Sequence, residues 1–561
     1  MRPFAIGNDS FGEIRSQNFK FIDKSLFIKE IFDNPGIKVT LIARPRRFGK
    51  TLNLSMLHHF LSSNVFGIET APLFEGLKIT QYPDIMAHLG RYPVIFLTLK
   101  GIKATSFETA RADFAGILQE LYKMHDYFLQ HPDFASTDKE SFLRILNLTG
   151  SDTDLHMALI RLCRWLTEYH QVKPWVLLDE YDTPIQTAYL NGYYQEMVAL
   201  MQPFLGNTLK TNPYVERAIL TGITRVAKES LFSDLNNVQV YTLFHDEYSK
   251  HFGFTEPEMD ALLIEADLIQ LSADIKYWYN GYLCGDTILY NPWSIINCVS
   301  KQGALAPYWV HTGGTSMIQN LLAQADAVVK TSFEELLQGR TIQARVSDHL
   351  IFGLFGSDLD SVMSLLLAAG YLKALTRTQE RSQWFCTLAI PNHEVLVLFE
   401  DCIMTWFGAQ GQNSRYDLLL QSLVKIDPEF FEEQLQELLL QTASYFDTGG
   451  KNPEKFYHGL ILGLLIQLKA YYLLESNRES GLGQYDIMLI PHDVTKPGIV
   501  MEFKVTRKSE TLETAANNAL TQIHTKNYAA SLRQRGITRI LAMGLAFQGK
   551  LVNVKYEWVG A

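Results

Sequence analysis

Short apolar runs alternate with amphipathic stretches along the first part of the chain. The runs have the composition of buried strands, and the stretches between them repeat their apolar residues at helical spacing. Strands separated by helices favour a parallel sheet that is covered on both faces, so we expect an α/β fold of this kind. The expected strands are 39–43, 92–99, 175–178 and 218–220, and the expected helices include 52–62 and 110–128.

The pattern changes twice after this sheet. From about residue 246 to 440 it is mainly helical, and Thr255 followed by Glu258 predicts a capping box at a helix start. A breaker at 448–453 then separates this region from a third, compact α/β unit. That unit is predicted to run in the order helix, strand 485–490, strand 499–505, helix 513–533 and strand 540–545. We therefore divide the chain into 1–245, 246–440 and 441–561.

Length and composition agree with several folded domains. At about 150 residues per domain, 561 residues correspond to between three and four units. With 47% hydrophobic and 20% charged residues, the chain does not have the composition of a disordered or collagen-like protein. Its net charge of -10 argues against a wholly basic nucleic-acid coat, although a local basic groove is compatible with it.

No membrane partner is expected. A spanning helix needs about 20 consecutive apolar residues, and the best candidate, 456–474, is interrupted by His458, Gln467 and Lys469. We expect a buried helix there. The first residues reach Asp9 before an apolar signal core forms. Because the five cysteines show neither paired zinc spacing nor a dense framework, we expect a cytoplasmic protein.

An expected strand, a turn and an expected helix follow one another at residues 39–62 in the order of a P-loop. The turn ends in Gly49, Lys50 and Thr51, and backbone N–H groups at such a helix start can cradle phosphate oxygens. Lys50 would neutralise the outer phosphates of ATP, and the Thr51 hydroxyl would hold Mg²⁺. The Gly-xxxx-Gly-Lys-Thr template has a glycine where this chain has Arg44. A basic turn that binds nothing is therefore the alternative interpretation of this motif alone.

A second strand favours nucleotide binding. The apolar run 175–178 is followed by Asp179 and Glu180, which is typical of a Walker B strand. Asp179 would contact Mg²⁺ through water, and Glu180 could polarise the attacking water, because adjacent residues at a strand end can serve metal and nucleophile separately. Two acids at a strand end are also common as solvated groups, so the pair alone does not indicate nucleotide binding. Together with the loop that contains Lys50, nucleotide binding becomes the favoured interpretation.

A third expected strand ends in polar and basic groups at 221–225. The carboxyl ends of parallel strands converge on one crevice in a doubly wound sheet. Thr221 could therefore sense the γ-phosphate, and Arg225 could stabilise the transferred charge. A surface arginine is the alternative interpretation of Arg225.

A second acidic site is predicted near the C-terminus. Asp486 opens one apolar strand, and Glu502 and Lys504 lie on the next, where period-two alternation puts both on one face. Two carboxylates can hold a divalent cation, while Lys504 can orient or deprotonate water and offset charge on a pentavalent phosphate. The trio could hydrolyse a phosphodiester, although Glu-x-Lys on a strand is often only a solvated cross-strand pair.

Two observations favour a site over such a pair. The strand that carries Glu502 and Lys504 is otherwise apolar, so burial of these charges would demand a partner or a metal. From Lys496 to the end, ten Lys or Arg residues stand against four Asp or Glu residues. A partner with a phosphate backbone would explain this local excess of positive charge.

Taken together, these motifs resemble those of bacterial and archaeal AAA-ATPase-like proteins that carry a C-terminal PD-(D/E)XK nuclease-like domain. The likeness covers nearly the whole chain and lies in 21–25, 44–51, 178–182, 221–225, 279–282 and 290–294. The resemblance implies a P-loop sheet, a mainly helical middle and a nuclease-like α/β domain. In this family Arg-Pro-Arg-Arg-Phe-Gly-Lys-Thr is the usual loop, so Arg44 is no defect. The residues implied in ATP binding are Arg47, Phe48, Gly49, Lys50, Thr51, Asp179, Thr221 and Arg225.

The C-terminal motif resembles the PD-(D/E)XK nuclease fold, with Asp486 as its first acid and 502–504 as its Glu-x-Lys element. Similarity to RecB-type members extends to His458 on the preceding helix and to Gln522 followed by Tyr528. Gln522 and Tyr528 are six positions apart instead of the four of the RecB pattern, and His458 could also be a core histidine.

We therefore expect an ATP-binding, ATP-hydrolysing protein coupled to Mg²⁺-dependent hydrolysis of nucleic acid, with DNA favoured over RNA and a homo-oligomer compatible with the sequence. The alternatives are a nucleotide-controlled interaction or remodelling module whose nuclease-like domain is non-catalytic, and an ATPase that does not cut. Aromatic residues at 276–282 could stack on bases, but core packing also explains them. The expected catalytic residues are Glu180, Asp486, Glu502 and Lys504, and the expected metal ligands are Thr51, Asp179, Asp486 and Glu502.

Overall fold

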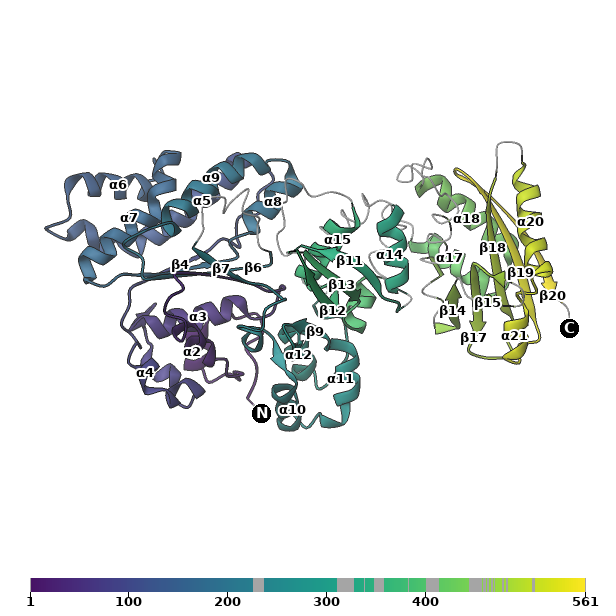
Figure 1. Cartoon of the computed structure of the whole chain (residues 1–561), viewed down its shortest axis with the longest axis horizontal. Helices are drawn as coiled ribbons and strands as arrows, with labels where there is room; N and C mark the ends of the chain where they lie inside the picture. The colour runs from purple at the N-terminus through teal and green to yellow at the C-terminus, as the bar shows by residue number, and fades with distance from the viewer. Residues whose placement is uncertain are drawn as a thin grey trace. The chain divides into compact units, whose positions relative to one another are not determined.

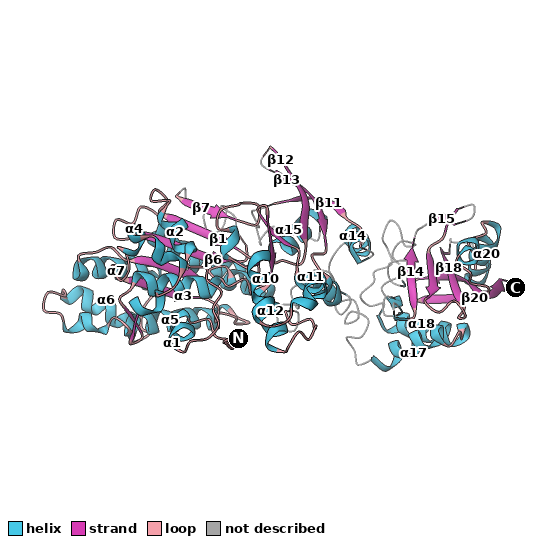
Figure 2. Ribbon diagram, turned by 90° about the horizontal axis from the view of Figure 1, so that it is seen from below, coloured by secondary structure: helices cyan, strands magenta, loops and turns pink. Residues whose placement is uncertain are grey.

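The chain folds into two compact units in the computed structural model (Figures 1 and 2). The first comprises Met1–Gly313, Gln343–Gly356 and Asp360–Val395, and the second comprises Gly314–Ile342, Ser357–Leu359 and Leu396–Ala561. The structure describes all residues except 1, 225–236, 310–326, 338, 348–357, 382, 400–412, 443–456, 458–460, 462–463, 466–467, 469, 477–478, 481–482, 507–509 and 560–561.

A five-stranded parallel sheet organises the first unit, which confirms the fold predicted from the alternating pattern. Its strand order is β4-β5-β6-β1-β7. Because β1, β5 and β6 are buried along their whole length, their sequences are nearly continuous apolar runs. The edge strand β7 shows no such run because its first two residues are partly exposed. The strands are β1 (Val39–Ala43), β4 (Val94–Thr98), β5 (Trp175–Asp179), β6 (Arg217–Gly222) and β7 (Val238–Tyr241).

Helices cover both faces of this sheet (Figure 1). On one face lie α2 (Leu26–Phe32), α3 (Lys50–Leu61) and α4 (Pro83–Met86). On the other lie α5 (Phe107–Lys123), α6 (Ser136–Leu146), α7 (Asp152–His170), α8 (Thr183–Asn191) and α9 (Tyr194–Leu209). A continuous apolar core joins this second group to the sheet, and it includes Ile95, Phe114, Trp165 and Phe204. Burial of that apolar surface fixes the strands and thereby the positions of their carboxyl ends.

Helices and two small sheets follow the parallel sheet. The predicted capping box at Thr255 is confirmed, since its main-chain N–H donates to the carboxylate of Glu258 at 2.8 Å. Tyr279 and Tyr282 are buried, so core packing accounts for these two aromatics. One sheet has the order β8-β10-β9 and the other β11-β13-β12. The elements are β8 (Phe254–Thr255), α10 (Glu256–Glu265), α11 (Ser272–Tyr279), β9 (Tyr282–Cys284), β10 (Thr287–Tyr290), α12 (Pro292–Ser300), β11 (Ile342–Val346), α15 (Leu359–Ala368), β12 (Lys373–Glu380) and β13 (Gln383–Ala389).

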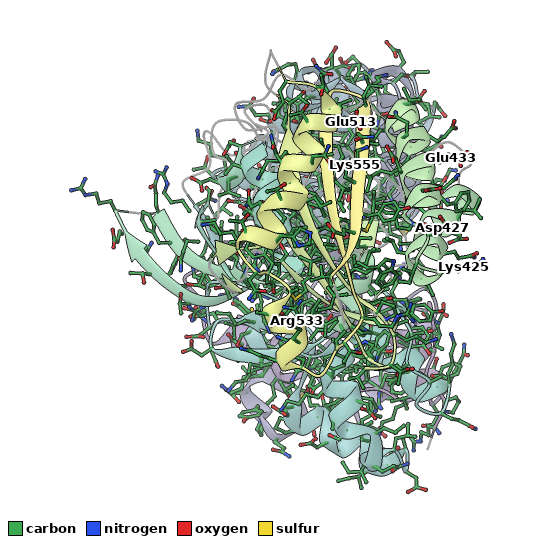
Figure 3. The ribbon with its side chains drawn as sticks, turned by 90° about the vertical axis from the view of Figure 1, so that its right-hand side faces the viewer. Lys425, Asp427, Glu433, Glu513, Arg533 and Lys555 are labelled. Carbon is green, nitrogen blue, oxygen red and sulfur yellow. The ribbon has the colours of Figure 1, made fainter. Side chains whose placement is uncertain are left out.

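A five-stranded mixed sheet of order β14-β17-β18-β19-β20 organises the second unit. The pair β18 and β19 is parallel, and the other three pairs are antiparallel. Helices α18 and α20 lie on opposite sides of this sheet (Figures 1 and 3). The strands are β14 (Tyr472–Ser476), β17 (Ile487–Pro491), β18 (Gly498–Val505), β19 (Ile540–Gln548) and β20 (Leu551–Val559). The helices include α14 (Ala327–Leu337), α17 (Asn413–Val424), α18 (Pro428–Thr442), α20 (Leu512–Thr525) and α21 (Ala530–Gln534).

The structure differs from the expected elements of the second unit in three places. The helix expected over 513–533 is two helices, because the chain turns after α20, where Asn527 has φ +53°. Of the helix expected over 456–474, Tyr457, Ile461, Leu464 and Leu465 are helical and buried, residues 472–474 belong to β14 instead, and nine residues lie outside the described part of the chain. The pattern does not single out β20, whose buried and exposed residues are mixed. Among the described helices, none is long and apolar enough to cross a membrane.

Candidate functional site

The turn between β1 and α3 carries the glycine-lysine-threonine motif. Gly49 is the N-cap residue of α3 and has φ +80°, a left-handed conformation that favours glycine. The ammonium of Lys50 donates hydrogen bonds to the carbonyl oxygens of Arg44 and Pro45, at 3.1 and 2.9 Å. Burial lowers the pKa of Lys50, and three nearby carboxylates oppose this shift. The carbonyl oxygens of the loop therefore surround the ammonium of Lys50, and the three carboxylates lie close enough to influence its charge.

Asp179, the last residue of β5, accepts hydrogen bonds from threonine hydroxyl groups of neighbouring segments. The hydroxyls of Thr51 and Thr221 donate to its two carboxylate oxygens at 2.8 and 2.7 Å, and that of Thr98 lies at 3.4 Å. These groups meet because β5 lies between β4 and β6 in the parallel sheet. Burial raises the pKa of Asp179, and the hydroxyl hydrogen bonds oppose the shift. The structure thus brings Thr51, Asp179 and Thr221 into one cluster.

Glu180 lies in the turn between β5 and α8. Its backbone has φ +50°, which is uncommon for a residue with a side chain. Its carboxylate accepts a hydrogen bond from the hydroxyl of Thr183 at 3.1 Å. The negative charge of Glu180 raises the pKa of both Arg47 and Lys50 against the effect of burial. Glu180 therefore lies near the loop, at the carboxyl ends of the strands. Arg225 lies outside the described residues.

Arg44 takes the position of the template's first glycine, and its side chain is bonded within the protein. It is fully buried and donates to the carbonyl oxygens of Ala43 and Tyr241 at 2.9 and 3.0 Å. A further bond reaches the carbonyl oxygen of Glu247 at 3.2 Å. These bonds tie the end of β1 to β7 and to the chain beyond it. Arg44 is therefore a structural arginine that fixes the start of the loop.

Asp182 belongs to the site although the sequence interpretation does not include it. Its Oδ2 accepts hydrogen bonds from the main-chain N–H groups of Ile223 and Thr224 at 3.0 and 2.9 Å, and from the Thr224 hydroxyl at 2.8 Å. A Cβ at Gly222 would lie 2.7 Å from its Oδ1, so the last residue of β6 must be glycine. The available signal was the third acid in the run 178–182. Asp182 therefore fixes Ile223 and Thr224, the two residues that follow β6 and precede Arg225 in the sequence.

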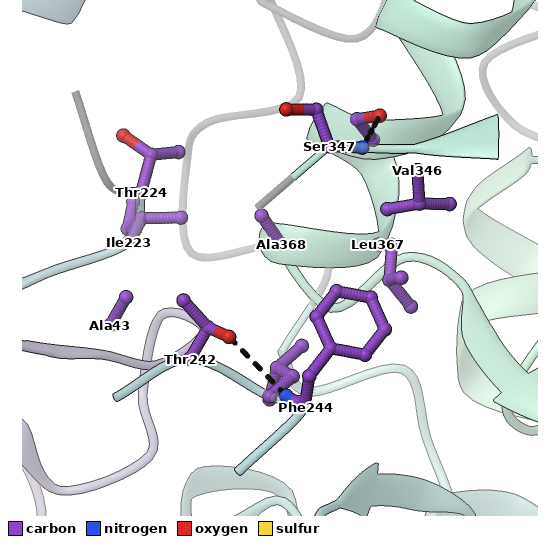
Figure 4. Close-up of a pocket in the computed structure, with 11 residues that line it drawn as sticks. Ala43, Ile223, Thr224, Thr242, Phe244, Val346, Ser347, Leu367 and Ala368 are labelled. Carbon is purple, nitrogen blue, oxygen red and sulfur yellow. Dashed lines mark hydrogen bonds between the residues drawn. The ribbon is translucent and has the colours of Figure 1, made fainter. Parts of the chain in front are cut away.

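A small cavity lies at the carboxyl ends of β1, β6 and β7 (Figure 4). Residues of β11 and α15 complete its wall. The main-chain N–H of Ser347 donates to the Ser364 hydroxyl there at 3.0 Å, and that of Phe244 lies 3.4 Å from the Thr242 hydroxyl. Its described lining is apolar apart from hydroxyl groups and contains no ionisable side chain. The described lining of this cavity therefore offers no charged side chain to a phosphate or a metal ion.

The second acidic cluster lies at the start of β17 and near the end of β18. The antiparallel register pairs Ile487 with Met501. Continued by one residue, it makes Asp486 and Glu502 neighbours. Asp486 accepts a hydrogen bond from the main-chain N–H of Phe503 at 2.6 Å. The structure therefore places the first acid directly beside the Glu-x-Lys element.

Glu502 is almost fully buried and bonds to side chains from two elements. The ammonium of Lys504 lies 3.1 Å from its Oε1, and the amide of Gln522 donates to the same oxygen. Gln522 comes from α20, which crosses the sheet at Gly544, the partner of Glu502 on β19. A Cβ at Gly544 would lie 2.4 Å from the carbonyl oxygen of Ala516. Glycine at this position therefore lets α20 bring its amide to the carboxylate.

Gln522 and Tyr528 meet despite their spacing. Helix α20 ends at Thr525, and the left-handed Asn527 turns the chain back. The amide nitrogen of Gln522 consequently lies 3.2 Å from the Tyr528 hydroxyl. Burial raises the pKa of Tyr528, the hydrogen bond with Gln522 opposes the shift, and the charge of Glu502 adds to it. The six-residue spacing thus reflects a turn after the helix and keeps both side chains at one site.

Both clusters offer oxygen ligands of the type that hard cations prefer. The second cluster has two carboxylates, and Mg²⁺ is commonly bound through one or two carboxylates with waters completing its shell. The first cluster has one carboxylate and threonine hydroxyls. His458 lies outside the described residues, and among those that are described no three His, Cys, Asp or Glu side chains gather closely enough to hold a metal ion. The oxygen donors of the two clusters are of the type that fits Mg²⁺.

Part of the positive charge near the C-terminus is used in ion pairs within the protein. Lys555 on β20 lies 2.7 Å from Glu513 on α20 (Figure 3). Arg535 lies 3.1 Å from Glu475, a buried carboxylate that also accepts a hydrogen bond from the Tyr485 hydroxyl at 3.0 Å. These two of the ten basic residues are therefore partly neutralised within the protein, and one of them, Arg535, by an acid that lies before Lys496.

Two family models match the chain. Residues 5–232 match a family described as a predicted AAA-ATPase. Residues 452–557 match the PD-(D/E)XK nuclease superfamily. The first match contains the loop and Asp179, and the second contains Asp486 and Glu502. The matches confirm the resemblance seen in the motifs.

A curated protein is similar to the chain over nearly its whole length. It is described as an uncharacterized protein in the vnfD 5′ region of Azotobacter chroococcum mcd 1, and it is 27% identical over 549 residues. The alignment covers 95% of this chain and 94% of that protein. The similarity therefore extends through the region between the two segments matched by family models.

Proposed function

Because the chain carries a predicted AAA-ATPase domain and a PD-(D/E)XK nuclease-superfamily domain, we propose that it binds and hydrolyses ATP and cuts nucleic acid with Mg²⁺. The observation that carries the nuclease half is the cluster on β17 and β18, where two carboxylates, an ammonium and an amide lie together. The loop beside Asp179 supports the ATPase half. DNA is the polymer that we propose, and the cytoplasm is the proposed site of action.

The loop would bind the triphosphate. Main-chain N–H groups of Arg47, Phe48 and Gly49 would cradle phosphate oxygens at the start of α3. Lys50 would neutralise the outer phosphates. Its buried position supports this role, because a cation with little hydration interacts more strongly with a phosphate than a solvated one does.

The strand ends would complete the ATP site. Thr51 and Asp179, whose side chains lie 2.8 Å apart, would hold Mg²⁺, which neutralises charge on the phosphates when bound. Glu180 would polarise the water that attacks the γ-phosphorus, and the bond from that phosphorus to the β–γ bridging oxygen would break. Thr221 would sense the γ-phosphate through its bond to Asp179. Arg225 would stabilise the negative charge that moves to the leaving oxygen.

The C-terminal cluster would hydrolyse the phosphodiester. Asp486 and Glu502 would hold Mg²⁺, which polarises water and neutralises charge on the scissile phosphate when bound. Lys504 would orient or deprotonate the attacking water. Water would add to phosphorus and one phosphorus–oxygen bond would break, so one product ends in a phosphate and the other in a hydroxyl. Gln522 and Tyr528 would keep the Glu502 carboxylate in place.

The division into 1–245, 246–440 and 441–561 is part of this proposal. It assigns nucleotide chemistry to the first part and cleavage to the last. The middle part would carry the coupling between them. A chain with both activities could use its nucleotide state to control when it cuts.

Two variants and a matched control test the proposal. Lys50→Ala should lose ATP hydrolysis, measured as phosphate release. Glu502→Gln should lose cleavage of labelled single-stranded, duplex and structured DNA, and of matching RNA, in Mg²⁺. Glu475→Gln changes another buried carboxylate of the same domain, which is bonded to Tyr485 and Arg535, and it should keep cleavage.

The outcomes separate the two halves. Cleavage that Glu502→Gln abolishes and Glu475→Gln retains supports the nuclease site. If neither Lys50→Ala nor Glu502→Gln alters cleavage, or if the wild type cuts no substrate, the nuclease half is wrong and the domain is a non-catalytic interaction module. ATP binding without phosphate release would restrict the first half to a nucleotide-controlled switch.

A further inference from the structure

The phosphate loop is held by the segment that follows the parallel sheet. Phe48 is buried, and its ring meets that of Tyr282 edge to face with centroids 5.0 Å apart. A Cβ at Gly253 would lie 3.2 Å from the Phe48 ring, so the backbone there approaches the loop closely. Pro45 packs in the same way against Gly370, where a Cβ would lie 2.8 Å from it. The loop is therefore packed against the protein on both sides of the half-buried Arg46 and the exposed Arg47.

The exposed arginine of the loop, Arg47, lies on an aromatic ring. Its guanidinium carbon is 4.3 Å from the centroid of the Trp293 ring, within the range of a cation–π interaction. In the described part of the chain this guanidinium donates no hydrogen bond, so its N–H groups are available to a ligand. Burial lowers the pKa of Arg47, and the charge of Glu180 opposes the shift. Arg47 thus contacts the Trp293 ring and is close enough to be influenced by the charge of Glu180, the acid that we assign to the attacking water.

Trp293 is itself fixed at the start of α12. Its main-chain N–H donates to the side chain of Asn291, the N-cap residue, at 2.9 Å. Its indole N–H donates to the carbonyl oxygen of Tyr308 at 3.1 Å. The next residue, Ser294, donates to the buried carboxylate of Glu394 at 2.7 Å. A ring held by its main chain and by its edge is a rigid platform for the arginine.

The backbone of the loop supports the same interpretation. Arg47 has φ +68° and Glu180 has φ +50°. Left-handed conformations are unfavourable for residues with side chains, and they persist where packing enforces them, often at ligand sites. For Arg47 the enforcing contact is the buried ring of the next residue, Phe48. The packing of Phe48 therefore holds Arg47 in an unfavourable backbone conformation, in which its side chain lies on Trp293.

We propose that Trp293 is a positioning residue of the ATP site, which holds the Arg47 guanidinium so that its N–H groups meet the phosphates next to Glu180. The inference rests on the proposed ATP binding at the loop, and it assigns a role to the 290–294 motif. The planar guanidinium can bind two phosphate oxygens at once and can stack on a ring with its donors free. A guanidinium that is already oriented loses less freedom when the nucleotide binds.

A double-mutant cycle tests this role. Trp293→Leu should weaken Mg·ATP binding about five-fold, the size expected from losing one cation–π contact. Trp293→Phe keeps an aromatic face and should stay close to wild type. On an Arg47→Ala background, Trp293→Leu should cause little further loss, because the two residues act as one unit. Trp278→Leu is the matched control, since that ring packs on His393 instead. Binding is measured by calorimetry with Mg·ATP and Mg·ADP.

The outcomes distinguish this inference from the proposed function. A wild type that does not bind Mg·ATP would overturn the ATP site itself. Binding that Trp293→Leu leaves unchanged, or a loss that persists in full on the Arg47→Ala background, would overturn the role of Trp293 while the ATP site stands. If Trp293→Leu does not fold, Arg47→Lys keeps the charge and loses the planar fork. Weaker binding by Arg47→Lys at an unchanged melting temperature supports the role, and unchanged binding overturns it.

Discussion

In the N-terminal sheet a buried acid ends a parallel strand and is held by hydroxyl groups, whereas in the C-terminal sheet the acids lie on an antiparallel pair and are held by an amide and an ammonium. Asp179 accepts bonds from Thr51 and Thr221, and Glu502 bonds to Lys504 and Gln522. A threonine hydroxyl can turn from a carboxylate to a cation, while an ammonium is no metal ligand but can act on water. The partners of a buried carboxylate therefore indicate which chemistry its site can perform.

The largest effects should come from changing one carboxylate to an amide in each site. Glu502→Gln should lower DNA cleavage about a thousand-fold and spare ATP hydrolysis, and Asp179→Asn should lower ATP hydrolysis by a similar factor, because a neutral amide cannot balance the charge of a divalent cation. Phosphate release and gel-based cleavage are measured in parallel. If Asp179→Asn abolishes cleavage too, cutting depends on the nucleotide state and the two sites do not act independently.

Gly544→Ala should break the C-terminal site through its helix. The new Cβ would lie 2.4 Å from a carbonyl oxygen of α20, so the helix must move and carry Gln522 away from Glu502. We expect a loss of about 3 kcal/mol in the free energy of unfolding, as for an overpacked core, together with weaker cleavage. Denaturant unfolding measures the first effect. Gly116→Ala on α5, where a Cβ would meet nothing within 4 Å, should not destabilise the protein.

Glu394 gives a pH-dependent test of the segment that holds the phosphate loop. Its carboxylate accepts bonds from Ser294 and from the main chain of Trp309, both at 2.7 Å. Burial raises its pKa from 4.5 to about 7. Between these values the native carboxyl keeps a proton that the unfolded chain has lost. Its contribution to the free energy of unfolding should therefore fall by up to about 3 kcal/mol as the pH rises through this window.

Glu394→Gln should remove this contribution. Denaturant unfolding gives the free energy of unfolding of wild type and variant at about pH 5 and about pH 7.5. The change between the two pH values is then compared between the two proteins. Wild type should lose more stability than the variant on going to the higher pH. Equal losses would show that Glu394 does not titrate in this window.

The smallest expected effects compare two hydroxyls at Asp179. Thr221→Val removes a bond of 2.7 Å, and Thr98→Val removes a contact of 3.4 Å. The first should cost about 1–2 kcal/mol of stability and slow ATP hydrolysis, because it leaves a buried carboxylate oxygen without its donor. The second should cost less, because the contact is long. Thermal unfolding measures both variants, and a larger effect from Thr98→Val would reverse this ranking of the hydroxyls.

Much of the fold could be predicted because the relevant signals are local. Buried parallel strands are continuous apolar runs, so β1 and β5 are visible in the sequence, and the capping box at Thr255 needs only a spacing of three residues. The sequence shows no local signal of this kind for the two-residue strand β8 or for the break between α20 and α21. The meeting of Gln522 and Tyr528 depends on that break, because a continuous helix would separate their side chains.

The amino-acid sequence by itself determined the similarity to the two family models and the types of chemical group that are available, since each loop or strand motif is a short run of residues. Only the tertiary structure decided which groups meet. The bonds of Asp182 to the turn after β6 join residues more than forty positions apart, and the stack of Arg47 on Trp293 joins the turn after β1 to helix α12. Such contacts arise from burial and packing of whole elements, which no short segment encodes.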